Sequence, residues 1–128
     1  MELRLRQGDI LTATTAVIAY PADSAGQVGT AILQDGRIQA PTMKHATEPI
    51  PPKQVELATV AALRCADEAG FTSVALPPFG TTTGQVDLAT AAKIMMETIQ
   101  MFRCDRSLQT VEVWLPSPEA LSHFQHYV

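Results

Sequence analysis

The stretch SVALPPFGTTTGQVD (residues 73–87) predicts how the rest of the chain folds. It begins with the short apolar run Ser73–Leu76, which is typical of a buried strand. Two glycines, Gly80 and Gly84, then enclose three threonines, and Asp87 is a favourable N-cap for the helical pattern that follows. The stretch therefore predicts a strand, a loop and a helix in succession.

The loop at residues 80–84 has the composition of an anion site. Glycines let backbone N–H groups approach a phosphate closely, and threonine hydroxyls can donate hydrogen bonds. The positive end of the following helix dipole favours negative charge at the same place. Most turns between a strand and a helix bind nothing, so an ordinary turn is the alternative interpretation of these residues.

The composition limits the class of protein. The 128 residues, 46% of them hydrophobic, suffice for one domain with a core and are too few for two, so we expect a single domain over residues 1–128. The net charge of −4 argues against nucleic acid as a partner, because gripping a phosphate backbone needs clustered lysine and arginine. It does not argue against a small phosphorylated ligand, which backbone amides can bind.

The cysteines and the hydropathy pattern predict the compartment. Cys65 and Cys104 lie far apart in helical patterns, so we expect two thiols in a reducing compartment and no disulfide. The first residues alternate charge with leucine and lack the apolar run of a signal peptide. No stretch is long and apolar enough to span a membrane. We therefore expect a cytoplasmic protein without a membrane partner.

Periodicity predicts the elements along the chain. Apolar residues recur at helical spacing at residues 53–69, 88–103 and 118–128, which we expect to form helices. Strand patterns occur at residues 2–6, 16–20, 30–33, 73–76 and 110–115, the first of them at or near a sheet edge. Pro21 is expected to end the second strand. Asp35-Gly36 predicts a hairpin, with a returning strand through Ile38 or, after Pro41, at residues 42–47.

Strands that alternate with helices predict an α/β fold, a three-layer α/β/α sandwich in which the three helices cover both faces of a mixed sheet. Ligands of such sheets bind at the carboxyl ends of the strands. Three loops leave the sheet there, and they carry Asp9, Asp23 and the Gly/Thr residues 80–84.

Four motifs along the chain resemble those of one family. They are Gly8-Asp9-Ile10-Leu11, then Tyr20-Pro21-Ala22-Asp23, then His45-Ala46-Thr47-Glu48-Pro49, and last Pro77-Pro78-Phe79-Gly80-Thr81-Thr82-Thr83-Gly84. In order and spacing they resemble the macro domain, a family of ADP-ribose-binding modules and ADP-ribosyl hydrolases. Its motifs are Gly-Asp-Ile-Thr, Asn-Ala-Ala-Asn, His-x-x-x-Pro and P-x-x-G-T-G-x-G. The resemblance covers nearly the whole chain and implies the macro-domain sandwich.

The chain departs from the family after its second strand. The family has a glycine-rich loop and a helix there, which wrap the diphosphate and the distal ribose. Here only residues 24–28 separate Asp23 from residues 29–33, which we interpret as the next strand, so the loop and helix are largely absent. In a second alignment residues 26–36 are a remnant of that loop, which would leave the next strand too short.

Three single positions also depart from the family. Thr82 stands where glycine is usual, and Asp23 stands where the family has the asparagine often tied to hydrolysis. The aromatic residue that often follows the last strand falls at Pro116, with Trp114 close by.

The resemblance implies a role for each site residue. Asp9 would accept a hydrogen bond from an adenine amino group, with the Ile10 N–H beside it. Ala22 and Asp23 would border the ligand, where Asp23 faces a ribose hydroxyl or positions a water. The diphosphate would be held by the backbone N–H groups of Gly80, Thr81, Thr82, Thr83 and Gly84.

Each role has a structural alternative. Asp9 can simply cap the turn after the first strand, and Asp23 can form a turn after Pro21, which we favour over catalysis. His45 is interpreted as a hydrogen-bonded strand histidine. His123 and His126 have no cysteine or paired carboxylate near them in sequence, so no metal site is expected.

The resemblance thus implies a module that binds ADP-ribose or a related adenine nucleotide diphosphate without a cofactor. A second hypothesis is an ADP-ribosyl hydrolase or ADP-ribose-phosphate processing enzyme, but hydrolysis needs a water held in a dry pocket, which the missing loop makes difficult. A third is a degenerate domain that serves assembly without a ligand. The open pocket edge at residues 23–29, with Tyr20 and Val28, favours a homo-oligomer in which a partner covers it.

Overall fold

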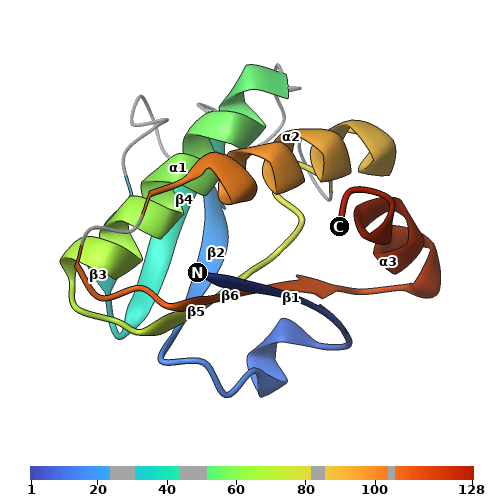
Figure 1. Cartoon of the computed structure of the whole chain (residues 1–128). Coiled ribbons are helices and arrows are strands. Elements are labelled where there is room, and N and C mark those ends of the chain that lie inside the picture. The colour runs from blue at the N-terminus through green and yellow to red at the C-terminus, as the bar shows by residue number, and fades with distance from the viewer. Residues whose placement is uncertain (24–30, 44–51, 82–85, 104–105) are drawn as a thin grey trace.

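The computed structural model describes residues 1–23, 31–43, 52–81, 86–103 and 106–128, and of residues 22, 23 and 41–43 it describes the backbone alone. The elements are, in chain order, β1 (Glu2–Gln7), the 3₁₀ helix η1 (Ile10–Thr12), β2 (Val17–Asp23), β3 (Ile32–Gln34), β4 (Arg37–Met43), α1 (Pro52–Glu68), β5 (Ser73–Leu76), α2 (Leu88–Met101), β6 (Thr110–Leu115) and α3 (Pro118–Gln125). Figure 1 shows their arrangement.

Within these residues six strands form one mixed sheet in the order β1-β6-β5-β2-β4-β3. Neighbouring strands are parallel except β3, which pairs antiparallel with β4. Asp35 and Gly36 join β3 to β4 with φ of 54° and 74°, values that a two-residue hairpin turn requires and that Asp and Gly tolerate. The α/β class, the mixed sheet, the edge position of the first strand and the hairpin are confirmed.

Two strand boundaries differ from the prediction. β2 does not end at Pro21 but continues to Asp23. Beyond Ile18 it pairs only with β4, so one side of the strand is open and a proline without an N–H is tolerated there. β4 runs through both Ile38 and Pro41, so the two alternatives for the returning strand are parts of one strand. The rest of the predicted strand at residues 42–47 lies outside the described residues after Met43.

Alternate residues of the strands form one core with the helices. Val17, Ala19, Val74, Val111 and Val113 are buried in the same cluster as the apolar residues of α1, α2 and α3. α1 contacts β4, β5 and β2, α3 contacts β1 and β6, and α2 lies between α1 and α3. Figure 1 shows the three helices on one side of the sheet and η1 on the other.

The expectation that these helices divide between the two faces is therefore wrong. The reason is the strand order, because the connections from β4 to β5 and from β5 to β6 step across the sheet in the same direction. Two right-handed connections that step in one direction place their helices on one face. The connection from β1 to β2 steps in the opposite direction, and it carries η1.

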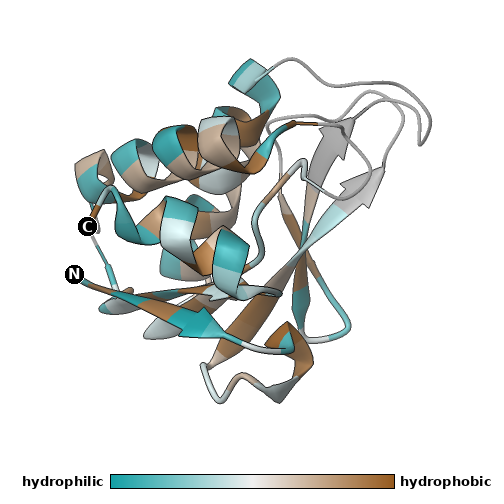
Figure 2. Ribbon diagram, turned by 90° about the vertical axis from the view of Figure 1, so that its right-hand side faces the viewer, coloured by the Kyte–Doolittle hydropathy of each residue, from teal (hydrophilic) through white to brown (hydrophobic). Residues whose placement is uncertain are grey.

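The other face of the sheet is mostly polar near β1. Glu112 is 7% exposed and accepts a hydrogen bond of 2.9 Å from Trp114 Nε1, with Arg6 Nε at 3.7 Å. The connection from β1 to β2 meets this face where the Ala16 N–H donates to Ser73 Oγ at 2.8 Å. Figure 2 shows strands and helices from a second side, with the hydropathy of each residue.

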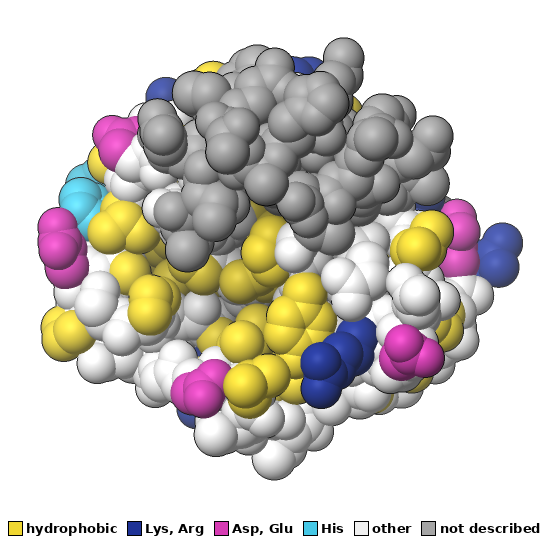
Figure 3. Space-filling view, turned by 180° about the vertical axis from the view of Figure 1, so that it is seen from behind, with side chains coloured by type: hydrophobic (Ala, Val, Ile, Leu, Met, Phe, Trp, Pro, Cys, Tyr) yellow, Lys and Arg dark blue, Asp and Glu magenta, His cyan; other side chains and the backbone are white. Residues whose placement is uncertain are grey.

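Hydrophobic side chains are also exposed around the far strands. Ile32 and Leu33 of β3 are 53% and 47% exposed, and Tyr20 of β2 lies with its ring 5.1 Å from the guanidinium of Arg37. Figure 3, the view from behind, shows hydrophobic side chains gathered in a hollow of that surface.

A buried carboxylate fixes the end of α1 to the start of β6. Asp67 is 5% exposed, and its Oδ1 accepts from the backbone N–H groups of Ser107 at 2.9 Å and Leu108 at 2.8 Å. The Ser107 hydroxyl donates to the carbonyls of Asp67 and Phe71. Gly70 ends the helix with a φ of 90°, as its position after the helical pattern predicted.

We expect Asp67→Ala to lower the free energy of unfolding by about 2–4 kcal/mol, because two buried N–H groups lose a charged acceptor. Urea unfolding followed by circular dichroism measures the change. Glu68→Ala, at the neighbouring exposed carboxylate, is the control and should change stability by less than about 0.5 kcal/mol. Equal stability of the two variants would contradict this role of Asp67.

Candidate functional site

The register of the sheet defines one level shared by three strands. Leu5 of β1 and Leu76 of β5 are both opposite Val113 of β6. Ile18 of β2 is opposite Ala75 of β5, so the next residue, Ala19, lies at the level of Leu76. All of these strands are parallel, so their carboxyl ends point to the same edge of the sheet.

Three predicted site residues come after this level in the sequence. Asp9, Gly80 and Asp23 each follow it by four residues. Two strand spacings, about 10 Å, separate the strand of Asp9 from that of Gly80, and β2 with Asp23 is the next neighbour. The predicted residues are thus spread along one edge over a span that suits an extended ligand better than a single ion.

The turn after β1 is built by Asp9. Its Oδ1 accepts from the Leu11 N–H at 2.9 Å, and its carbonyl accepts from the N–H and the hydroxyl of Thr12 at 2.9 Å and 2.6 Å. The structural alternative, an Asp that caps the next turn, is therefore confirmed. The side chain is exposed, and a carboxylate has further lone pairs that a ligand can use. Ile10 beside it is half-buried.

Trp114 supports the start of this turn. Gly8 has a φ of 145° and donates to the Leu115 carbonyl at 3.0 Å, and a Cβ atom at Gly8 would lie 3.4 Å from Cζ3 of Trp114. The indole is in turn held by Glu112. Sequence reasoning noted Trp114 but missed Glu112, although their spacing of two in a strand places them on one face.

The other loop begins at a tight turn. Gly80 is buried with a φ of 81°, and its carbonyl accepts from the Val86 N–H at 3.0 Å, which holds the two ends of the Gly/Thr loop together. The hydroxyl of Thr81 donates to the Pro78 carbonyl at 2.8 Å, and its N–H does so at 3.4 Å. Thr81 therefore stabilises the turn with its hydroxyl. Thr82, Thr83 and Gly84 lie outside the described residues.

The helix that follows is capped by its own carboxylate, as predicted. Asp87 Oδ1 accepts from the Thr90 N–H at 3.3 Å, and its carbonyl accepts from the Ala91 N–H at 3.0 Å. One N–H at the start of α2 is thus already used, and a negative charge stands there. An anion at this edge would have to bind the amides of the preceding loop.

The remaining predicted residues are only partly located. Ala22 and Asp23 end β2 with a shift of register between them, and their side chains lie outside the description, as do His45 and Val28. The buried hydroxyl of Tyr20 has no hydrogen-bond partner among the described residues. Among the described residues no group of three His, Cys, Asp or Glu could hold a metal ion.

Two further expectations concern the thiols and the membrane. Cys65 is a free thiol, and burial, followed by the charge of Glu68, raises its pKa, so a reactive thiolate is disfavoured. Cys104 lies outside the described residues. In the part of the chain that the structure describes, no helix has the length and apolar character to cross a bilayer.

Comparison with known proteins agrees with the motifs. The family model described as Macro domain matches residues 27–95, more than half of the chain. An uncharacterized protein of Aquifex aeolicus (strain VF5) is 30% identical in an alignment of 158 residues that covers 89% of this chain and 96% of the relative. The alignment is longer than this chain, so the relative has insertions that the chain lacks.

Solved structures share the fold. A mutant Oceanobacillus iheyensis macrodomain with ADPR matches with a TM-score of 0.82 at 19% identity, over 98% of this chain and 90% of that one. The Trypanosoma brucei macrodomain in complex with ADP gives a TM-score of 0.82 at 13% identity, over 98% of this chain and 68% of that one. By its sequence, motif order and fold, the chain belongs to the macro domain family.

Proposed function

We propose that the chain is a module that binds ADP-ribose or a related adenine nucleotide diphosphate at the carboxyl edge of its sheet. The observation that carries the proposal is the register, which brings the Asp9 turn and the Gly80 turn to the same edge of the sheet. Family membership supports it, as do solved macrodomains that contain ADPR or ADP.

The Asp9 turn would bind the adenine. Ile10 is the first residue of η1, so its N–H has no carbonyl partner within the helix and can donate to a ring nitrogen. The exposed Asp9 carboxylate can accept from the exocyclic amino group beside that nitrogen. Adenine presents such a donor and acceptor side by side. Trp114, held by its hydrogen bond to Glu112, would pack beside Gly8 and stabilise this turn.

The Gly/Thr loop would bind the diphosphate through backbone amides. The Val86 N–H donates to the Gly80 carbonyl, which brings the described residues on either side of this loop together. Gly80, Thr81, Thr82, Thr83 and Gly84 would present their N–H groups, and no lysine or arginine lies in this loop. Affinity should therefore depend on close approach of the backbone to the anion.

We further propose that the module binds without turnover. Ala22 and Asp23 would border the ribose, and Asp23 is the one carboxylate there that could orient a water for an ADP-ribosyl hydrolase. The missing segment after β2 leaves that water poorly shielded. Residues 1–128 would act as one cytoplasmic domain that binds no nucleic acid. Incubation with ADP-ribose derivatives and chromatography of the products would reveal any hydrolysis.

We expect Asp9→Ala to weaken ADP-ribose binding by about one to two decades, since a hydrogen bond to a charged acceptor contributes roughly 1.5–3 kcal/mol. Binding of pyrophosphate, which lacks adenine, should stay nearly unchanged. Calorimetric titration measures both. The matched control is Asp35→Asn, at an exposed carboxylate of the hairpin at the opposite edge of the sheet. A loss of pyrophosphate binding in Asp9→Ala would contradict an adenine-specific role.

Gly84→Val should abolish binding of both ADP-ribose and pyrophosphate while the fold survives, because a branched side chain keeps the anion from the loop amides. Circular dichroism checks the fold. A folded variant that binds as well as wild type would show that this loop is not the anion site. If wild type itself gives no heat with ADP-ribose, ADP or AMP, the domain without a ligand becomes the better explanation.

The single tryptophan of the chain provides an optical test. Because Trp114 contacts Gly8 beside the Asp9 turn, ADP-ribose should change its fluorescence, and pyrophosphate should change it much less. Trp114→Phe should lose the signal and still bind in calorimetry. Equal responses to the two ligands would place the adenine elsewhere.

A further inference from the structure

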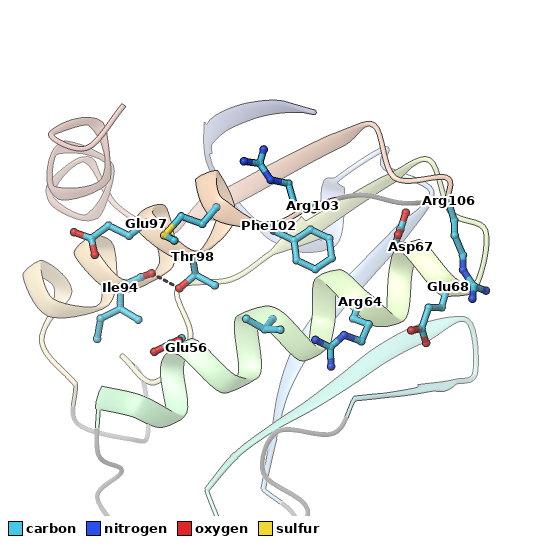
Figure 4. Close-up of a pocket in the computed structure, with 12 residues that line it drawn as sticks. Glu56, Arg64, Asp67, Glu68, Ile94, Glu97, Thr98, Phe102, Arg103 and Arg106 are labelled. Carbon is cyan, nitrogen blue, oxygen red and sulfur yellow. Dashed lines mark hydrogen bonds between the residues drawn. The ribbon is translucent and has the colours of Figure 1, made fainter.

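We propose that the chain forms a two-fold symmetric homodimer through the groove between the outer faces of α1 and α2. This α1–α2 groove has a volume of about 620 Å³ and runs from Glu56 and Ile94 to Arg64 and Arg106 (Figure 4). It lies on the helical layer and not at the carboxyl edge of the sheet, so the proposal is independent of the ligand site.

The middle of the α1–α2 groove is apolar. Val60 of α1 and Ile94, Met101 and Phe102 at or after α2 line it. Met101, the last residue of α2, is 77% exposed. Phe102, the C-cap, is half-buried and packs in part against the core. Burial of such a strip against a partner would be favourable.

The two ends of the groove carry opposite charge. Figure 4 shows Glu56 and Glu97 at one end and Arg64, Arg103 and Arg106 toward the other. Asp67 and Glu68 also lie at this end and offset two of the three arginine charges, which leaves it net positive. Glu56 is already paired with Lys53 at 3.0 Å, which makes Glu97 the clearer probe of the acidic end.

This distribution identifies a second copy of the chain as the occupant. A rotation of 180° about an axis through the middle of the groove brings the acidic end of one copy to the basic end of the other, and the apolar strips meet at the axis. A two-fold interface requires such self-complementarity. The opposite charges also fix the orientation, because copies that met with like ends together would repel each other.

The groove extends along the helices away from the nucleotide site. The helices run from the carboxyl edge of the sheet toward its amino edge, because α1 and α2 each connect parallel strands. The arginine end therefore lies away from the Asp9 and Gly80 turns. Variants in the groove should dissociate the dimer without changing ADP-ribose binding, so failure of one proposal can be distinguished from failure of the other.

Sedimentation equilibrium tests the dimer. We expect wild type to dimerise at micromolar concentration, and Glu97→Arg or Arg64→Glu alone to raise the dimer Kd by at least about tenfold. An equimolar mixture of the two variants should form a heterodimer. In one of its two contacts both charges are exchanged, so an arginine at position 97 meets a glutamate at position 64. The other contact keeps the native Arg64 and Glu97, so both contacts are attractive. Higher salt should weaken the wild-type dimer, since the charges are exposed.

Glu2→Arg, an exposed charge reversal of the same size on β1, is the matched control and should dimerise like wild type. Monomeric wild type would overturn the proposal. So would a dimer that survives both single variants, which would indicate another surface, such as that of Ile32 and Leu33 on β3. Two variants that remain monomers when mixed would equally overturn it.

Discussion

The pairing of β6 between β1 and β5 is the constraint on which the rest of the structure depends. It joins the first strand of the chain to the last one and sets the level of both against β5. Without it, the Asp9 turn would have no fixed position relative to the Gly80 turn. Glu112 and Trp114 lie on this same strand, so the element that aligns the two turns also supports one of them from below.

Both turns are stabilised internally. Asp9 accepts from the N–H groups of Leu11 and Thr12, and the Gly80 carbonyl accepts from Val86. These bonds occupy groups that sequence reasoning assigned to a ligand, the hydroxyl of Thr81 above all. They also fix the backbone of the Asp9 turn and of Gly80 and Thr81. Capping and binding are thus compatible uses of the same short segments.

Helix existence and extent were well predicted because propensity, capping and periodicity agree within each segment. Pro52, Gly70, Asp87 and Ser117 mark helix boundaries by local chemistry, and the helices begin or end within a few residues of them. The prediction that Pro21 ends its strand was wrong because a strand accepts proline where its N–H side has no neighbouring strand. Whether a neighbour is present there depends on the tertiary structure.

The placement of α1 and α2 on one face could not be predicted from the sequence, because it follows from strand order and crossover direction. The site was predicted as a set of loops but not as a set of hydrogen bonds. That the loops share one edge of the sheet could be predicted, because they follow parallel strands. The hydrogen bonds of Thr81 and Glu112 could not, because they depend on the final packing.

The β1–β6 pairing also has a consequence for synthesis on the ribosome. β1 is made before the other described strands, and β6, its one neighbour among them, follows most of the domain later. Pairing at such sequence separation is slow, so β1 waits as an unpaired strand. Its outward residues Glu2, Arg4 and Arg6 are charged, and charged side chains on an unpaired strand oppose aggregation with other chains. The alternation of leucine and charge in β1 thus opposes aggregation of this strand before β6 has been made.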